Sequence, residues 1–154
     1  MIRSTRRLYT RLLLVVFFAL QLSNCSGTRP DNVGRFASCP ETPNCVSSMA
    51  QKSDTTHYIK PFRLATEPTI VWEGLIDIVE HYPRSNIVTR KSNYLYAEFT
   101  SLIMRFVDDV EFHLDEDNKI EVRSASRLGS SDFGVNRERI ENIRAKLLEA
   151  KLIE

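Results

Sequence analysis

The stretch of sequence that decides the fold is IMRFVDDVEFHLDEDNKIEVRSAS, residues 103–126. Apolar and polar residues alternate on both sides of the acidic segment DEDN, residues 115–118, whose composition is typical of a turn. The apolar residues that share one face are Val110, Phe112, Leu114, Ile120 and Val122. This period of two predicts a pair of antiparallel strands, 103–114 and 119–126, with one buried face.

Weaker patterns extend the sheet towards the N-terminus. Residues 57–64, 87–91 and 94–100 are expected to be strands, and Pro61 places the first of them at a sheet edge. The chain shows no internal repeat and no second domain.

Two segments carry apolar residues at helical spacing. The first begins at Thr66-Glu67-Pro68, with Thr66 as the expected capping residue, and Pro83 ends it. The second runs from its expected cap, Asn136, to about Ala150. The order strand, helix, four strands, helix predicts an α+β fold in which two helices cover an antiparallel sheet of about five strands. This order resembles the TATA-binding-protein-like and helix-grip arrangements.

The first 25 residues have the pattern of an export signal. Four arginines precede an apolar run, 12–22, which is shorter than the roughly 20 residues of a membrane-spanning helix and has the length of a signal-peptide core. The segment Leu22-Ser23-Asn24-Cys25 matches the processing site of a bacterial lipoprotein, except that a small residue is usual in place of Asn24. We therefore predict a signal peptide, 1–24, and lipidation of Cys25 with palmitate. The alternatives are an uncleaved anchor or ordinary cleavage nearby.

Lipidation of Cys25 would set the organisation and the location of the rest of the chain. Residues 25–38 are expected to be a lipidated tether, and residues 39–154 a single domain. A serine directly after the lipidated cysteine, here Ser26, resembles the residue found in lipoproteins that are sent to the outer membrane. We therefore expect a membrane protein of the cell envelope, lipid-anchored to the outer membrane and facing the periplasm. From Cys25 on, 17 basic residues stand against 20 acidic ones. The net charge of −3 argues against a nucleic-acid partner.

Cys39 and Cys45 remain as a pair with five residues between them. In an oxidising periplasm we expect them to form a disulfide that closes a small loop, and two free thiols are the alternative. Two thiols are too few for a structural zinc site, and no metal is expected.

Three ordered blocks of sequence carry a resemblance to a known family. They are CPETPNCVSS at 39–48, FVDDVEF at 106–112, and a third that runs from RSASRLG at 123–129 through Asp132 to GVNR at 134–137 and Arg139. Together they resemble the bacterial and plastid family named domain of unknown function 1499, over about residues 32–148. The resemblance implies no established activity, cofactor or catalytic residue, and members of the family are often exported or membrane-associated.

Charged and hydroxyl residues gather in the last two predicted strands and in the segment after them. The candidate site residues are Asp108, Asp109, Arg123, Ser126, Arg127, Asp132, Arg137 and Arg139. One interpretation is a structural ionic cluster, which fixes the register of the strands and orders the following loop. The other is a site for an anion or another polar ligand, in which Arg127, Arg137 and Arg139 converge beside the first turn of the last helix.

No catalytic motif is present, and we expect neither an enzyme nor a cofactor. Gly129 and Gly134 have the spacing of the glycines in a phosphate loop, but the Lys-Ser/Thr pair is missing. Asp108 and Asp109 are adjacent and are expected to point to opposite sheet faces, unlike a catalytic dyad. The three histidines lie in separate elements without the spacing of metal ligands.

The leading hypothesis is a non-catalytic domain that binds a small or apolar ligand between the sheet and the last helix. The alternative is a protein-interaction or structural module of the cell envelope, which uses its charged sheet edge or the loop between Cys39 and Cys45. An enzyme of unknown reaction is the third hypothesis. A sizeable apolar cavity under the last helix would favour a ligand, whereas a filled core and an exposed apolar patch would favour a partner.

Overall fold

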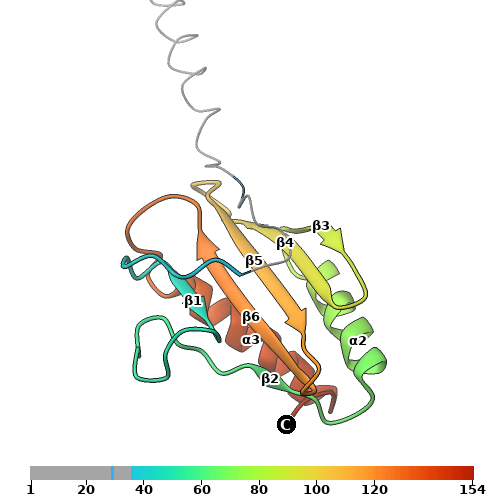
Figure 1. Ribbon diagram of the computed structural model, residues 1–154. Coiled ribbons are helices and arrows are strands. Elements are labelled where there is room, and N and C mark those ends of the chain that lie inside the picture. The colour runs from blue at the N-terminus through green and yellow to red at the C-terminus, as the bar shows by residue number, and fades with distance from the viewer. Residues whose placement is uncertain (1–28, 30–35) are drawn as a thin grey trace, which may run out of the picture.

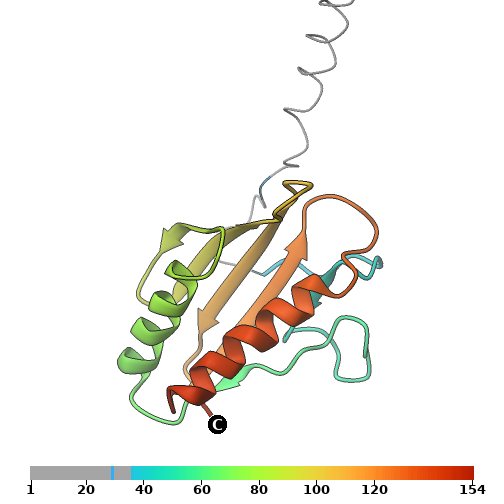
Figure 2. The ribbon, with the colours of Figure 1, turned by 180° about the vertical axis from the view of Figure 1, so that it is seen from behind.

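The computed structural model describes Arg29 and residues 36–154 (Figure 1). These residues form an α+β domain, in which one antiparallel sheet of six strands is covered on one face by two helices (Figures 1 and 2). In chain order the elements are β1 (Cys45–Ser47), β2 (Phe62–Arg63), α2 (Pro68–Glu80), β3 (Ser85–Arg90), β4 (Tyr94–Thr100), β5 (Val107–Leu114), β6 (Lys119–Ser126) and α3 (Val135–Glu149). The predicted fold class is confirmed.

The hairpin of β5 and β6 forms the centre of the sheet. Phe112 pairs with Val122 and Leu114 with Ile120, so the apolar residues of both strands lie on one face. The carboxylate of Asp115 closes the turn, because it accepts hydrogen bonds from two backbone N–H groups of the residues that follow. The strand order is β1-β6-β5-β4-β3, and the short strand β2 also pairs with β6.

The hydrophobic core lies between the two helices and the inner face of the sheet. Each helix turns one apolar stripe towards the sheet, as the helical spacing predicts. The buried residues are Val71, Trp72, Leu75, Ile76 and Val79 of α2, Ile140, Ile143 and Leu147 of α3, and Leu95, Ala97, Phe99, Val110, Phe112, Ile120 and Val122 of the sheet. Burial of a large aliphatic or aromatic side chain contributes about 1.5–3 kcal/mol, so this layer is the main source of stability.

Two predicted strands are shorter in the structure. The segment 103–106 belongs to the turn between β4 and β5, where Arg105 has a positive φ of 57° that no strand residue adopts. In the segment 57–64, only Phe62–Arg63 forms a strand. Pro61 has no N–H to donate, so a longer ladder cannot form at that position.

An edge strand, β1, was not predicted, because three residues are too few to show a period of two. Its first residue, Cys45, lies opposite Ala125 of β6. Cys45 also forms the predicted disulfide with Cys39, with an S–S distance of 2.06 Å and Cα atoms 5.6 Å apart. The disulfide is confirmed, and it attaches the preceding loop to the edge of the sheet.

The start of α3 differs from the prediction that Asn136 caps it. The helix begins at Val135, after Gly134 with a φ of 83°, and Asn136 lies inside the first turn. The carboxylate of Asp132 takes the capping role, because it accepts hydrogen bonds from the backbone N–H groups of Gly134 (2.9 Å) and Asn136 (2.8 Å). This frees the side chain of Asn136 to point into the domain.

The start of α2 also differs by one residue. Glu67, not Thr66, occupies the cap position, and no side chain accepts a hydrogen bond there. Pro68 is the first helical residue and has no N–H that would need a cap. The helix ends at Glu80, before Pro83.

The predicted signal peptide, 1–24, and the lipidation site Cys25 lie outside the described residues, as does most of the tether 25–38. In the part of the chain that the structure describes, neither helix is long and apolar enough to span a membrane.

Candidate functional site

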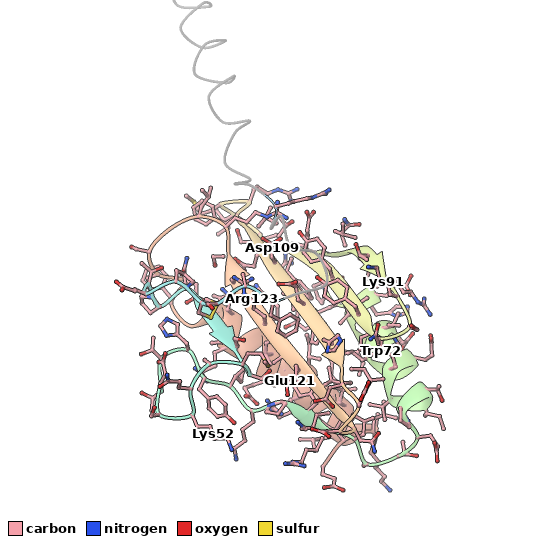
Figure 3. The ribbon with its side chains drawn as sticks, viewed as in Figure 1. Lys52, Trp72, Lys91, Asp109, Glu121 and Arg123 are labelled. Carbon is pink, nitrogen blue, oxygen red and sulfur yellow. A yellow bond between two sulfur atoms is a disulfide. The ribbon has the colours of Figure 1, made fainter. Side chains whose placement is uncertain are left out.

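Two adjacent aspartates divide the candidate residues between the two faces of the sheet. Asp108 faces the helices, where its carboxylate accepts a hydrogen bond from Arg139 of α3. Asp109 faces the opposite side and binds Arg127. Figure 3 shows Asp109 and Arg123 on this outer face, with the helices behind the sheet. Because successive side chains of a strand alternate, all the candidates except Arg137 fall into two clusters instead of one site.

The first cluster centres on Asn136, whose side chain is completely buried. We call it the Asn136 cluster, and its members are Asn44, Asp108, Ser124, Ser126, Asp132, Asn136 and Arg139. The amide oxygen of Asn136 accepts hydrogen bonds from the hydroxyl of Ser124 and from Nη1 of Arg139 (2.7 Å). Its amide nitrogen donates to the backbone oxygen of Asn44 (3.1 Å), the hydroxyl of Ser126 (3.0 Å) and the carboxylate of Asp132 (2.7 Å).

The Asn136 cluster is a closed network. Arg139 adds a hydrogen bond to the hydroxyl of Ser124 (3.0 Å), and its guanidinium carbon lies 4.9 Å from the ring centroid of Phe99. No buried side-chain nitrogen or oxygen of the cluster lacks a hydrogen-bond partner among the described residues. The hydrogen bonds of the cluster join the residue before β1, the strands β5 and β6, the loop after β6 and the helix α3. Because these groups bond to one another, the cluster is a structural network.

The second cluster lies on the outer face of the sheet. We call it the outer-face cluster, and its members are Tyr94, Tyr96, Glu98, Asp109, Glu111, Arg123 and Arg127. Nη2 of Arg127 lies 2.6 Å from carboxylate oxygens of both Asp109 and Glu98, and the hydroxyl of Tyr96 donates to Asp109 (2.6 Å). Burial, together with the Asp109 carboxylate, raises the pKa of Tyr96, so its hydroxyl stays protonated.

The other half of the outer-face cluster is built around Glu111, which is almost completely buried. The hydroxyl of Tyr94 donates to its carboxylate (2.6 Å), and Nη1 of Arg123 lies 3.4 Å from the other oxygen. Burial raises the pKa of Glu111. The hydrogen bond from the Tyr94 hydroxyl and the positive charge of Arg123 offset this increase only in part. Nε of Arg123 is buried without a hydrogen-bond partner in the described structure.

The expected convergence of three arginines is wrong. Arg127 lies in the outer-face cluster, and Arg139 lies in the Asn136 cluster on the other face. Arg137 is in neither, because its guanidinium donates to the backbone oxygens of Thr56 (3.0 Å) and Tyr58 (2.9 Å). Residues two positions apart in an α-helix are rotated by about 200° around its axis, so Arg137 and Arg139 project from opposite sides of α3.

An open groove that was not predicted from the sequence lies between the segment after β1, the strand β6 and α3. We call it the charged groove, and it encloses about 1010 Å³. Its charged lining residues are Lys52, Lys60, Arg63, Lys119, Arg137, Arg144, Glu121, Glu141 and Glu154. Figure 3 labels two of these residues, Lys52 in the loop at the edge of the molecule after β1, and Glu121 on β6. They come from separate segments without any common spacing, so no sequence signal identifies the groove.

The charged groove has free cations and one unsatisfied carboxylate oxygen. Lys52, Lys60 and Arg63 are exposed, and none of them has an ion-pair partner among the described residues. Oε2 of Glu121 is buried without a hydrogen-bond partner in the same part of the chain. Arg144 has a structural role, because its Nη1 and Nη2 donate hydrogen bonds to the backbone oxygens of Pro61 and Lys60, which line the groove.

The space between α3 and the sheet is filled. Ile140, Ile143 and Leu147 are fully buried against the inner face, and none of them lines the charged groove or the other larger pockets. An apolar ligand therefore has no room beneath α3 in this structure.

The three histidines lie in separate parts of the structure, in the segment between β1 and β2, after α2 and in β5. Nδ1 of His57 lies 2.7 Å from the carboxylate of Asp54, and His81 is exposed beside Asp77. Among the described residues, no three His, Cys, Asp or Glu side chains are grouped so that they could hold a metal ion.

Comparison with models of protein families assigns residues 35–147 to the family described as "Protein of unknown function (DUF1499)". The chain belongs to this family. The resemblance seen in the three sequence blocks is thereby confirmed. Comparisons with curated proteins and with solved structures found no match. The DUF1499 match includes every strand of the sheet and nearly all of α3, so both clusters and most of the charged groove belong to the family domain.

Proposed function

We propose that this DUF1499 protein is a lipid-anchored component of the bacterial cell envelope, whose single domain binds another envelope component without catalysis. The anchor is Cys25, at the outer membrane and facing the periplasm. The Cys39–Cys45 disulfide is compatible with an oxidising compartment. Among the described residues, the polar groups of one cluster are satisfied and those of the other are densely paired, so the charged groove is the surface we assign to the partner.

The observation that carries this proposal is the filled space under α3 beside an open groove with unpaired cations. An enclosed apolar ligand has no cavity there, whereas an open groove of about 1010 Å³ accepts an extended segment from outside. Lys52, Lys60 and Arg63 lack carboxylate partners among the described residues, so an acidic segment of a protein partner fits best.

Site-specific photo-crosslinking in cells tests the partner. A photoreactive amino acid replaces Lys52 or Lys60 in the groove, and Lys146, which is exposed on α3 outside the groove, gives the matched control. We expect a discrete crosslinked protein from the two groove positions and none from the control. Equal crosslinking at all three positions, or none at Lys52 and Lys60, contradicts the proposal. Native mass spectra with a bound small molecule would favour the ligand hypothesis.

Palmitate labelling tests the anchor separately. Labelling of the wild type that is lost in Cys25→Ser supports lipidation at Cys25. Labelling that persists in the variant, or is absent from the wild type, contradicts it.

A further inference from the structure

Exposed apolar side chains of the domain gather at one end. Seven of the ten large apolar residues that the described part of the chain exposes lie where β4 and β6 end and β5 begins. We call this surface the apolar loop end, and its residues are Leu102, Ile103, Met104, Phe106, Leu128, Phe133 and Val135. Ile103 is 84% exposed and Phe133 is 98% exposed. Figures 1 and 2 show both loops at the same end of the molecule, with the C-terminus at the other.

The two loops are adjacent and internally hydrogen-bonded. The backbone N–H of Arg127, at the start of the second loop, donates to the backbone oxygen of Val107, at the end of the first (3.1 Å). Within the first loop, Ser101 and Phe106 exchange hydrogen bonds of 2.8 and 2.9 Å. The apolar side chains therefore project from an ordered surface.

One residue of the apolar loop end, Phe133, also has an unfavourable backbone conformation. Phe133 has a φ of 55°, a left-handed conformation that is unfavourable for a bulky side chain. No contact within the described domain repays that cost, because the ring is almost fully exposed. Strained backbone of this kind clusters at functional sites, so it supports a functional role for this loop.

Cationic side chains flank the apolar loop end. Arg105 is exposed within the first loop, and Arg84 is exposed beside it, since its Nε donates to the backbone oxygen of Thr100 (3.1 Å). Glu138 is an exposed carboxylate on the first turn of α3. Exposed apolar residues interleaved with arginines match the interface of a bilayer that contains anionic lipids.

The covalent chain brings the lipid anchor to this same end. Nε of Arg29 lies 2.7 Å from Oε1 of Glu98, two residues before the end of β4. Glu98 also binds Arg127, at the start of the second loop. Cys25 precedes Arg29 by four residues, which span at most about 14 Å. Acyl chains on Cys25 would therefore enter a bilayer within reach of the apolar loop end.

We propose that the apolar loop end inserts into the membrane surface that the anchor enters, and so docks the domain in one orientation. This inference rests on the proposed anchor at Cys25.

Tryptophan fluorescence in vesicles tests the insertion. The full chain is expressed so that it is processed, and the purified protein is reconstituted into vesicles of phosphatidylethanolamine and phosphatidylglycerol. Ile103→Trp places a probe on the apolar loop end, and Ile70→Trp places the matched control on an exposed isoleucine at the start of α2, at the other end of the domain. Trp72 is common to both proteins. With lipids brominated in their acyl chains, the probe at position 103 loses most of its added emission, whereas the control at position 70 keeps it.

The same samples separate the inference from the anchor on which it rests. Intact-mass measurement shows whether Cys25 is acylated. An acylated protein whose probe at position 103 keeps its emission in brominated vesicles overturns the docking and leaves the anchor standing. An unacylated Cys25 overturns the anchor and, with it, the expectation that acyl chains enter the bilayer near the apolar loop end. A probe shielded from aqueous iodide but not quenched by brominated lipid shows that a protein surface covers the loops, which also overturns the proposal.

A second variant tests the role of charge. Arg84→Gln/Arg105→Gln, made in the Ile103→Trp protein, is expected to reduce the quenching by brominated lipid, and removal of phosphatidylglycerol is expected to have the same effect. The fold is expected to be unchanged because the substituted side chains are exposed, and circular dichroism checks this. Unchanged quenching in both cases contradicts the electrostatic part of the proposal.

Discussion

The side chain of Asn136 connects parts of the chain that are far apart in sequence. It bonds the backbone before β1, two serines of β6, the loop that follows and a neighbouring arginine of α3. The sequence indicated a polar residue at the start of a helix, and the obvious role for such a residue is a cap. That prediction failed because Asp132, four residues earlier, already satisfies the backbone at the helix start.

Asn136→Ala is expected to lower the free energy of unfolding by roughly 2–6 kcal/mol, because two or more buried groups lose their partners at about 1–3 kcal/mol each. Urea unfolding measures the loss. Asn142→Ala makes the same chemical change at an exposed position of the same helix, and should alter stability by less than about 0.5 kcal/mol. Similar effects of the two substitutions would show that the buried hydrogen bonds are not stabilising.

Glu98 gives the domain an acid-sensitive stabilisation. Burial alone would raise its pKa, but hydrogen bonds from Arg127 and Arg29 outweigh this effect and leave the pKa lowered. Since the folded pKa lies below the unfolded one, the stabilisation is complete above the usual glutamate pKa of about 4.3 and is lost as the pH falls through the folded value.

Glu98→Gln should therefore flatten the acid limb of stability against pH. Between about pH 6 and pH 3, the wild type loses more free energy of unfolding than the variant does. Urea titrations at a series of pH values measure the difference. Parallel curves would mean that Glu98 contributes no proton linkage to folding.

At the scale of elements, sequence pattern succeeded where a segment is long enough to show its period. β4 and β6 have the predicted bounds, and both helices present the predicted apolar stripes. β1 was missed because its three residues show no alternation, and residues 103–106 were assigned to a strand because three of the four are apolar. Apolar side chains normally indicate burial, whereas here they belong to an exposed surface.

The packing of α3 can be tested with two adjacent leucines. Leu147 is fully buried, and Leu148 is 44% exposed. Leu147→Ala should cost about 2–5 kcal/mol, because it leaves a cavity in the core, while Leu148→Ala should cost much less. Thermal and urea unfolding compare the two. Equal losses would contradict the assignment of α3's buried face.

The disulfide stabilises the edge of the sheet by constraining the unfolded chain. Chain-entropy arithmetic for so short a loop gives about 2 kcal/mol. Cys39→Ser/Cys45→Ala should lower the free energy of unfolding by about that amount, and reduction of the wild type should reproduce the loss. Insensitivity of the wild type to reductant would contradict the prediction.

At the scale of the whole molecule, the candidate residues show what a sequence cannot specify. The polar residues of β5 and β6 were identified, since charge within strands is conspicuous. Their division between two faces followed from alternation, but their partners did not, because Tyr94, Tyr96 and Glu98 lie on a different strand. The charged groove depends on tertiary packing of separate segments, and its existence required the structure.

The proposed docking predicts an orientation for the whole domain. The C-terminal residue, Glu154, lies beside Arg63 near the start of β6, at the opposite end from the apolar loop end. An eight-residue strand spans about 26 Å, so a donor fluorophore at Glu154 should lie roughly 25 Å from the bilayer if the strands stand upright. Energy transfer to a membrane dye should be weak there and strong from a donor at Ser131. Equal transfer from both positions would contradict the orientation.

The pairing of β1 with β6 has a consequence for timing. Cys45 lies opposite Ala125, so the earliest strand finds its neighbour only after most of the chain has been made. Synthesis proceeds from the N-terminus, and contacts between distant segments form late. The first strand to be synthesised, β1, is therefore among the last to join the sheet. The short loop between Cys39 and Cys45 needs no distant partner and can close first. A chain cut before Lys119 lacks the strand that β1, β2 and β5 all require, and cannot build this sheet.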